Sequence, residues 1–334
     1  MKKYIVVSLI IAIVIVVLFA VFSLINISSL SSGPTLTLTI GGPALETSGL
    51  IYIAEDQHYF DQNRLNVTEV MYDSGGATIS GVLNNNVDIG MMSEYVMTNS
   101  ILQGENITSV GSIDKFDNMF LIGRKDRGTD TIPGLQGKII GIPEGTIADF
   151  YFGRFLELNR LTLNNLTIID VRPKDAPGII VNGTADAVIT WHPYIDTIPG
   201  QNTGNFAVWD IQSGQLTYWD AVCRADWVPG HQIEIERFLQ SLAEAEQFRE
   251  QHPAEADLII KKRLGYTDAY MATAVLPANQ YGLSLDRGMI AAMKDEARWE
   301  MENNLTNTTQ IPDFPNYMYV NGLQIIEPGS VDLG

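Results

Sequence analysis

Two pairs of small or hydroxyl-bearing residues stand where predicted strands give way to predicted helices. Ser74 and Gly75 occupy this position early in the chain, and Gly145 and Thr146 occupy it again further on. Glycine lets the backbone approach a ligand closely, and the free N–H groups of a helix N-terminus attract negative charge. Both pairs are therefore candidate ligand-binding positions. The alternative is that Ser74 and Thr146 are ordinary N-caps.

Two acidic residues stand beside further hydroxyl residues at predicted strand ends. Glu46, Thr47 and Ser48 precede the first predicted helix, while Ser93 and Glu94 follow the third predicted strand. If both carboxylates face one cleft, they favour a cationic or zwitterionic ligand. Otherwise the two acids lie on the surface and the hydroxyl residues cap helices.

Aromatic residues make a third candidate group. Trp191, His192 and Tyr194 end a predicted strand in the second half, and Trp219 lies on a later segment that returns between the two halves. An aromatic pair here can stack on a planar ligand or pack against its alkyl part. The alternative is a wedge that packs between the two halves of the protein.

Residues suited to catalysis or metal binding are sparse. The sequence has no His-Glu-x-x-His motif, no Gly-x-Ser-x-Gly elbow and no Gly-Lys-Ser/Thr phosphate loop. Cys223 is the single cysteine, which excludes a disulfide framework and a thiolate metal site. We therefore expect no catalytic residue, no metal and no cofactor. The histidines are scattered, at His58, His192, His231 and His252.

The elements that must position these residues repeat one plan, in which a short apolar strand leads into an amphipathic helix. This alternation predicts an α/β fold with mostly parallel strands. The expected helices include Gly49–Tyr59, Ala77–Asn84 and Ile147–Asn159, and the tail from His231 to Arg298 is mainly helical. The expected strands are Leu36–Ile40, Asn66–Tyr72, Val87–Met91, Ile107–Ile113, Met119–Gly123, Lys138–Ile142, Leu166–Val171, Ala185–Thr190, Phe206–Ile211 and Ala221–Arg224.

The same alternation predicts two lobes enclosing a cleft. We expect residues 36–115 and 219–334 to form the first lobe and residues 116–218 to form the second. The chain would cross between them near 114–118 and return between 210 and 221, which makes a two-stranded hinge.

The N-terminal segment predicts a membrane anchor or signal over residues 1–27 and a tether over residues 28–35. Lys2 and Lys3 precede an apolar run from Tyr4 to Ile25, and about 20 such residues span a bilayer as a helix. Lysines before the run and none just after it put the remainder of the chain outside the cell membrane. We expect a single-pass, uncleaved anchor. The alternative is a cleaved signal peptide.

Glycosylation sequons support an exterior location. They begin at Asn26, Asn66, Asn106, Asn165, Asn182, Asn304 and Asn307, against about three expected by chance. The excess indicates a glycoprotein, and the alternative is a chain rich in Asn and Thr. A formal charge of −18 excludes nucleic acid as a partner.

The segment from Gly49 to Phe60 resembles the helix and turn of solute-binding proteins of ABC importers, in the nitrate/sulfonate/taurine and thiamine-pyrimidine branch. His58 and Arg64 stand where that family commonly has glycine. Five further motifs occur in the family's order, at residues 74–76, 86–90, 134–138, 142–146 and 183–187. The resemblance covers about residues 37–226 and implies a type II periplasmic-binding-protein fold, two lobes with a two-stranded hinge.

The resemblance also implies a function. We expect a monomer that captures a small organic anion or zwitterion, such as taurine or another aliphatic sulfonate, and delivers it to an ABC permease and its ATPase. One alternative is a binding protein for a thiamine-related pyrimidine or similar planar amine. A pyrimidine-synthase-like enzyme shares the fold, but its Cys-rich segment is missing here, where Cys223 stands alone.

Overall fold

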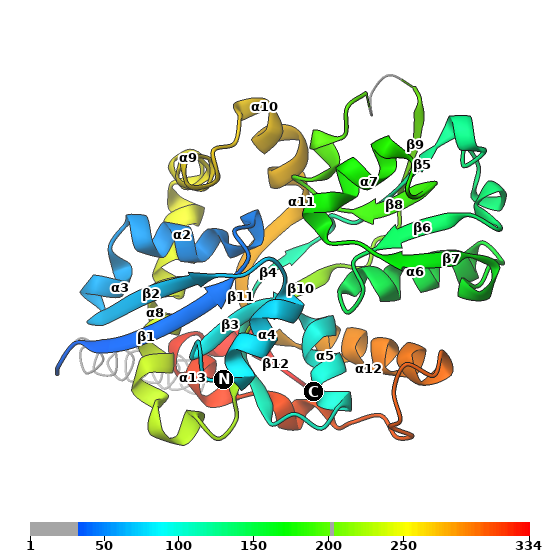
Figure 1. The fold of residues 1–334 in the computed structure, drawn as a ribbon. Helices are drawn as coiled ribbons and strands as arrows, with labels where there is room; N and C mark the ends of the chain where they lie inside the picture. Colours follow the sequence, from blue (N-terminus) through cyan, green and yellow to red (C-terminus); the bar gives the residue numbers. More distant parts are fainter. Residues whose placement is uncertain (1–32, 201–203) are drawn as a thin grey trace, which may run out of the picture.

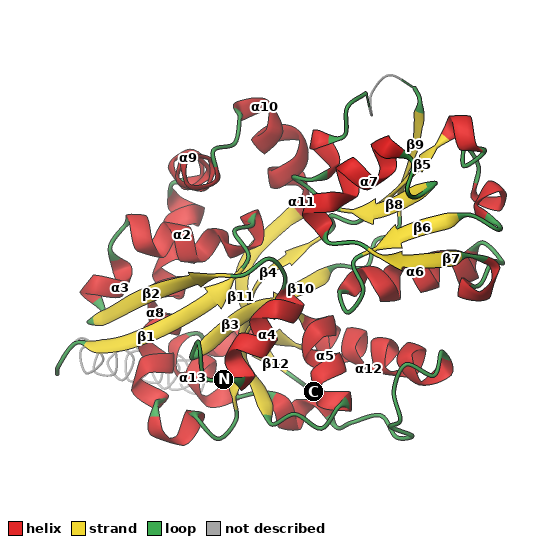
Figure 2. Cartoon of the chain, viewed as in Figure 1, coloured by secondary structure: helices red, strands yellow, loops and turns green. Residues whose placement is uncertain are grey.

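The computed structural model describes residues 33–200 and 204–334. They form two α/β lobes, each with helices against a central sheet (Figure 1, Figure 2). Within these residues no helix combines the length and apolarity needed to cross a membrane. The predicted anchor at residues 1–27 and the sequon at Asn26 lie outside the described residues.

The first lobe is built on a seven-stranded sheet in the order β12-β11-β4-β10-β3-β1-β2. Its strands come from both ends of the described chain, so the tail returns to complete the lobe that the N-terminal part begins. They are β1 (Leu36–Gly42), β2 (Leu65–Met71), β3 (Ile89–Ser93), β4 (Ile107–Phe116), β10 (Thr217–Arg224), β11 (Asn279–Asp286) and β12 (Val331–Asp332).

Helices cover this sheet and bury its apolar side chains. Leu50, Ile53, Ile89, Val110 and Phe238 are fully buried in one continuous core. The helices are α2 (Gly49–Asp56), α3 (Tyr59–Gln62), α4 (Gly75–Leu83), α5 (Glu94–Leu102), α8 (Gln232–Gln251), α9 (Pro253–Leu264), α10 (Asp268–Tyr270), α11 (Leu276–Ala278), α12 (Arg287–Glu302) and α13 (Val320–Ile326).

The second lobe has a five-stranded sheet in the order β7-β6-β8-β5-β9. Its core holds Leu121, Ile140, Phe152 and Ile189, all fully buried. Its strands are β5 (Phe120–Arg124), β6 (Ile139–Ile142), β7 (Thr167–Asp170), β8 (Ala187–Thr190) and β9 (Phe206–Asp210), and its helices include α6 (Ile147–Leu158) and α7 (Ala176–Asn182).

The chain crosses between the sheets twice, at residues 117–119 and at residues 211–216. Gln212 ties the crossings together, because its Oε1 accepts from the Asn118 N–H at 2.5 Å and its Nε2 donates to the Phe116 carbonyl at 3.1 Å. An outgoing strand and a returning strand run in opposite directions, so β10 pairs antiparallel with β4 and β9 with β5. The predicted α/β class is confirmed, but the prediction of mostly parallel strands is wrong, because both sheets are mixed.

Two local predictions need correction. The single helix expected at Gly49–Tyr59 ends at Asp56, and α3 begins only at Tyr59. His58 separates them with φ 59°, and Arg64 has φ 56°. The two residues that stand where the family commonly has glycine therefore both have a left-handed backbone conformation, which glycine adopts without steric cost.

The tail is less uniformly helical than predicted. Within the span from His231 to Arg298 it contains β11, which pairs antiparallel with β4. The strand Asn279–Asp286 is short and lies between helices. The helical spacing of apolar residues on both sides of it therefore conceals it in the sequence.

Candidate ligand-binding site

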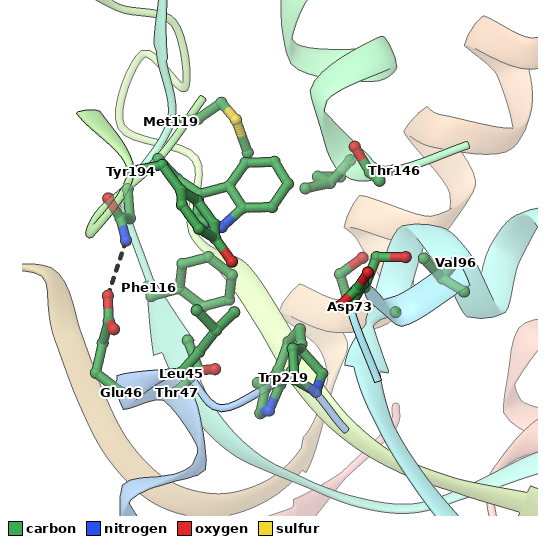
Figure 3. Close-up of a pocket in the computed structure, with 17 residues that line it drawn as sticks. Leu45, Glu46, Thr47, Asp73, Val96, Phe116, Met119, Thr146, Tyr194 and Trp219 are labelled. Carbon is green, nitrogen blue, oxygen red and sulfur yellow. Dashed lines mark hydrogen bonds between the residues drawn. The ribbon is translucent and has the colours of Figure 1, made fainter. Parts of the chain in front are cut away.

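A cavity lies between the two lobes, next to the carboxyl ends of β1, β3 and β8 (Figure 3). Its volume is about 50 Å³, which leaves room for a few water molecules or one small ligand. Residues from both lobes and from the first crossing line it: Pro43, Leu45, Glu46, Thr47, Asp73, Ser74, Gly75, Ser93, Val96, Phe116, Asn118, Met119, Thr146, Ile147, Trp191, Tyr194 and Trp219.

Three helices begin at the cavity wall. Gly75 is the first residue of α4, Ser93 is the N-cap of α5, and Thr146 is the N-cap of α6. Ser74 Oγ accepts from the Ala77 N–H at 3.2 Å, and Thr146 Oγ1 accepts from the Ala148 N–H at 3.3 Å. Both side chains therefore act as ordinary caps. The positive ends of the three helices still converge on the cavity.

One carboxyl group is fixed in the wall of the first lobe. Glu46 is 1 % exposed, and its Oε1 accepts from Asn118 Nδ2 at 3.0 Å, the dashed contact in Figure 3. Its Oε2 accepts from the Tyr266 hydroxyl at 2.9 Å. Burial raises the pKa of Glu46 above its usual value. Asn118 Oδ1 in turn accepts from the His192 N–H at 2.9 Å, so one amide joins the carboxyl to the second lobe.

Two buried polar atoms of lining residues have no hydrogen-bond partner among the described residues. They are Thr47 Oγ1 from the first lobe and Trp191 Nε1 from the second. The indole N–H of Trp219, by contrast, donates to Ser48 Oγ at 3.2 Å. An unpaired buried polar group costs about 1–3 kcal/mol. Both residues line the cavity, so a ligand oxygen that accepts from either donor removes the cost of that donor.

The remaining wall is mostly apolar and aromatic. No Lys, Arg or His appears among the lining residues in the described part of the chain. The second acid, Asp73, is exposed and accepts from Lys174 Nζ of the second lobe at 2.6 Å, and this contact lowers the pKa of Asp73. A bare inorganic anion therefore meets no cationic side chain in the wall.

Most of the sequence-predicted residues come together. Eight of them line the cavity: Glu46, Thr47, Ser74, Gly75, Ser93, Thr146, Trp191 and Trp219. Three others lie beside it. Ser48 stands behind Trp219, the Gly145 N–H donates to Asp149 at 2.6 Å, and the His192 ring pairs with Asp196 and packs edge-on against Tyr270.

Glu94 does not line the cavity, so the expected convergence of two carboxylates on one ligand is absent. Glu94 is fully buried, and its Oε2 accepts from the Tyr218 N–H of β10 at 3.1 Å. Burial raises its pKa well above the usual value, and the neighbouring Glu296 and Asp220 raise it further. As the first residue of α5, Glu94 contacts the sheet behind the cavity.

Neither the first crossing nor the apolar wall is predicted from the sequence as part of the site. The sequence places Asn118 in a crossing segment, but nothing in it indicates that the amide faces the cavity. The lining residues that the sequence does not indicate are Pro43, Leu45, Asp73, Val96, Phe116, Asn118, Met119 and Ile147. Tyr194, the predicted aromatic partner of Trp191, also lines the cavity, and the centroids of the two rings are 6.3 Å apart.

Comparisons with known proteins agree with this architecture. The family model described as "NMT1/THI5 like" matches residues 47–256. The Bacillus subtilis (strain 168) protein named "Putative aliphatic sulfonates-binding protein" is 22 % identical over 198 residues, which are 59 % of this chain and 60 % of that protein. The chain thus spans about three fifths of the length of this curated relative.

Two solved structures share the fold. The alkanesulfonate-binding protein SsuA from Xanthomonas axonopodis pv. citri, bound to MOPS, aligns with a TM-score of 0.72 and 16 % identity, over 86 % of this chain and 100 % of that chain. The periplasmic nitrate-binding protein NrtA from Synechocystis PCC 6803 aligns with a TM-score of 0.70 and 15 % identity, over 88 % of this chain and 89 % of that chain. These likenesses establish a two-lobe periplasmic-binding-protein fold.

Proposed function

The chain belongs to the NMT1/THI5-like family, and from this premise we propose that it is an extracytoplasmic solute-binding protein of an ABC importer. It captures a small organic anion or zwitterion between its lobes and delivers the ligand to a membrane permease driven by an ATPase. The names of its sulfonate- and nitrate-binding relatives support this class of function.

The observation that carries the proposal is the pair of unpaired buried donors. Thr47 Oγ1 and Trp191 Nε1 belong to different lobes and line one cavity. A sulfonate has three acceptor oxygens, so it can satisfy both donors while the N-termini of α4, α5 and α6 stabilise its charge. Ligand binding then favours the closed arrangement of the lobes, by motion about the two crossings.

Within this class, a zwitterion such as taurine fits the cavity better than a bare anion. Glu46 supplies an acidic partner for an amine, whereas no basic side chain that lines the cavity in the described part of the chain offsets the charge of nitrate. The Xanthomonas neighbour has bound MOPS, a sulfonate that also carries an amine. We therefore rank taurine-like zwitterions above nitrate, sulfate and bicarbonate.

A planar amine such as a thiamine-related pyrimidine is the second candidate. Phe116, Trp191, Tyr194 and Trp219 all line the cavity and offer rings on which a planar ligand can stack. Glu46 would then pair with the exocyclic amine of the ligand.

Calorimetric titration of the folded domain with a ligand panel tests these functions. Taurine and related aminosulfonates are expected to bind, and mass analysis of the ligand after incubation is expected to find it unchanged. Tight binding of nitrate with none of taurine would overturn the zwitterion proposal. Preferred binding of an aminopyrimidine would favour the second candidate, and conversion of any ligand would indicate an enzyme.

The location outside the cytoplasm rests on residues 1–27, which the sequence alone supports as an anchor. Native protein is expected to start at Met1 or Lys2 and to require detergent for extraction. A protein starting near Ser32 is expected to be soluble and folded. A mature N-terminus after Phe22 would show that this segment is a cleaved signal peptide and not an anchor.

A further inference from the structure

Six of the seven sequons fall in the described residues, and five of their asparagines are exposed. These five are Asn66, Asn106, Asn182, Asn304 and Asn307. The sixth, Asn165, is half-buried. This division separates acceptors that are open to a glycan in the folded protein from one that is only partly accessible.

Two of the exposed sequons, those of Asn66 and Asn182, present the asparagine and the hydroxyl residue together, whereas in the Asn106 sequon Thr108 is buried and donates to the Tyr317 carbonyl at 3.0 Å. At the turn after α7, Thr184 Oγ1 donates to Asn182 Oδ1 at 2.7 Å, and the Thr184 N–H donates to the same oxygen at 2.9 Å. On β2, Asn66 and Thr68 are both exposed, and alternation along a strand puts them on one face. β2 is the edge strand of its sheet, and the exposure of both side chains means that this face is open to solvent there.

Asn165 is engaged in local structure instead. Its Oδ1 accepts from the Thr162 N–H at 3.0 Å and from Thr162 Oγ1 at 3.0 Å, which closes a capping box at the turn before β7. The sugar would be attached at Nδ2, and the half-buried Asn165 side chain leaves it less room than the five exposed asparagines do.

The exposed acceptors all lie away from the ligand cavity, and none lines it. Asn106 directly precedes β4, whose last residue, Phe116, lines the cavity, so about ten extended residues, roughly 30 Å, separate them. The Asn182 turn precedes β8, and Trp191 follows the other end of that strand.

The remaining pair lies near the far end of α5. In the Asn307 sequon, Thr308 Oγ1 donates to the carbonyl of Leu102 at 2.9 Å. Leu102 is the last residue of α5, whose N-cap Ser93 lines the cavity. The Asn307 sequon therefore contacts the end of α5 opposite the cavity-lining N-cap.

We propose that Asn66, Asn106, Asn182, Asn304 and Asn307 carry N-linked glycans and that Asn165 does not. The proposal rests on the extracytoplasmic location given above and is independent of the ligand. The donor is an oligosaccharide linked through phosphate to a polyprenol. Asparagine Nδ2 bonds to C1 of the first sugar, the C1–O bond to the carrier phosphate breaks, the carrier leaves with its phosphate, and the amide proton passes to the base of the transferase.

Mass spectrometry of peptides from the full chain, purified from its native host, tests this assignment. We expect a glycan mass on each of the five exposed asparagines and an unmodified Asn165. Bare exposed asparagines, or a modified Asn165, would overturn the assignment. Protease treatment of intact cells measures location separately, so a cytoplasmic protein would overturn both the location and the glycans, whereas an exterior protein with bare asparagines would overturn the glycans alone.

A pair of variants isolates one site. Thr184→Ala removes the hydroxyl of the sequon and is expected to lower the intact mass by one glycan beyond the change in the side chain. Thr184→Ser keeps the sequon and is expected to keep the glycan. Loss of the glycan in both variants would contradict the role assigned to the hydroxyl. Both are expected to bind the ligand as the unmodified protein does, because the turn is outside the cavity.

Discussion

Replacement of Trp191 by phenylalanine separates ligand binding from folding. The change removes the Nε1–H donor and keeps an aromatic ring against the cavity. If the donor bonds to a sulfonate oxygen, its loss removes a hydrogen bond to a charged group, worth about 1.5–3 kcal/mol. The dissociation constant of an aminosulfonate is then expected to rise roughly 10- to 150-fold.

The ligand-free protein is expected to respond differently. Its Trp191 N–H is buried without an acceptor among the described residues, so removing the donor also removes a desolvation cost. The smaller ring loses some packing, and these effects oppose each other. The free energy of unfolding is expected to change by no more than about 1 kcal/mol.

Trp299 provides the matched control. Its Nε1 is also buried without a partner among residues 33–200 and 204–334, but the Trp299 side chain packs against Gly153 of α6 and does not line the cavity. Trp299→Phe is expected to leave the dissociation constant unchanged. Titration calorimetry gives the affinities and thermal unfolding gives the stabilities. Unchanged affinity in Trp191→Phe, or equal weakening in both variants, would refute the assignment of the donor to the ligand.

Three further substitutions test charge and backbone. Glu46→Gln is expected to weaken taurine binding more than 10-fold through loss of a charged partner, and equal calorimetric affinities would contradict this. Burial raises the pKa of Glu296 from 4.5 to about 8, so between these pH values the folded protein keeps a proton that the unfolded chain releases. The free energy of unfolding therefore falls as the pH rises from 4.5 to about 8. Glu296→Gln is expected to flatten this pH dependence in denaturant titrations. His58→Gly is expected to stabilise the fold by about 0.5–1 kcal/mol by relieving left-handed strain, and a lower midpoint in urea would argue against strain there.

The sequence predicts the fold and the loops of the site because both depend on local patterns. Apolar strands followed by Ser74-Gly75 and by Gly145-Thr146 indicate helix starts, and parallel strands bring such starts to one edge. The sequence cannot indicate which way a side chain turns within such a loop. Glu46 and Glu94 stand beside hydroxyl residues in the same way, yet only Glu46 lines the cavity, because Glu94 bonds to the backbone of β10.

The other omissions arise from contacts distant in sequence. β10 and β11 pair with β4, more than 100 residues earlier, and no local periodicity encodes this pairing. Phe116 and Met119 line the cavity because the chain leaves the first lobe between them. Their types alone predict core packing rather than a ligand contact.

Asn118 makes the crossing a point of thermodynamic linkage. Its amide donates to Glu46 and accepts from the backbone of His192, while its N–H donates to Gln212 in the other crossing. A ligand amine that draws Glu46 away from this amide weakens one of the bonds holding the lobes at their present angle. By reciprocity, a change of that angle alters the affinity of Glu46 for a proton or a cation to the same extent. For a ligand that carries an amine, as proposed above, ligand charge and lobe geometry are thus coupled through the Asn118 side chain.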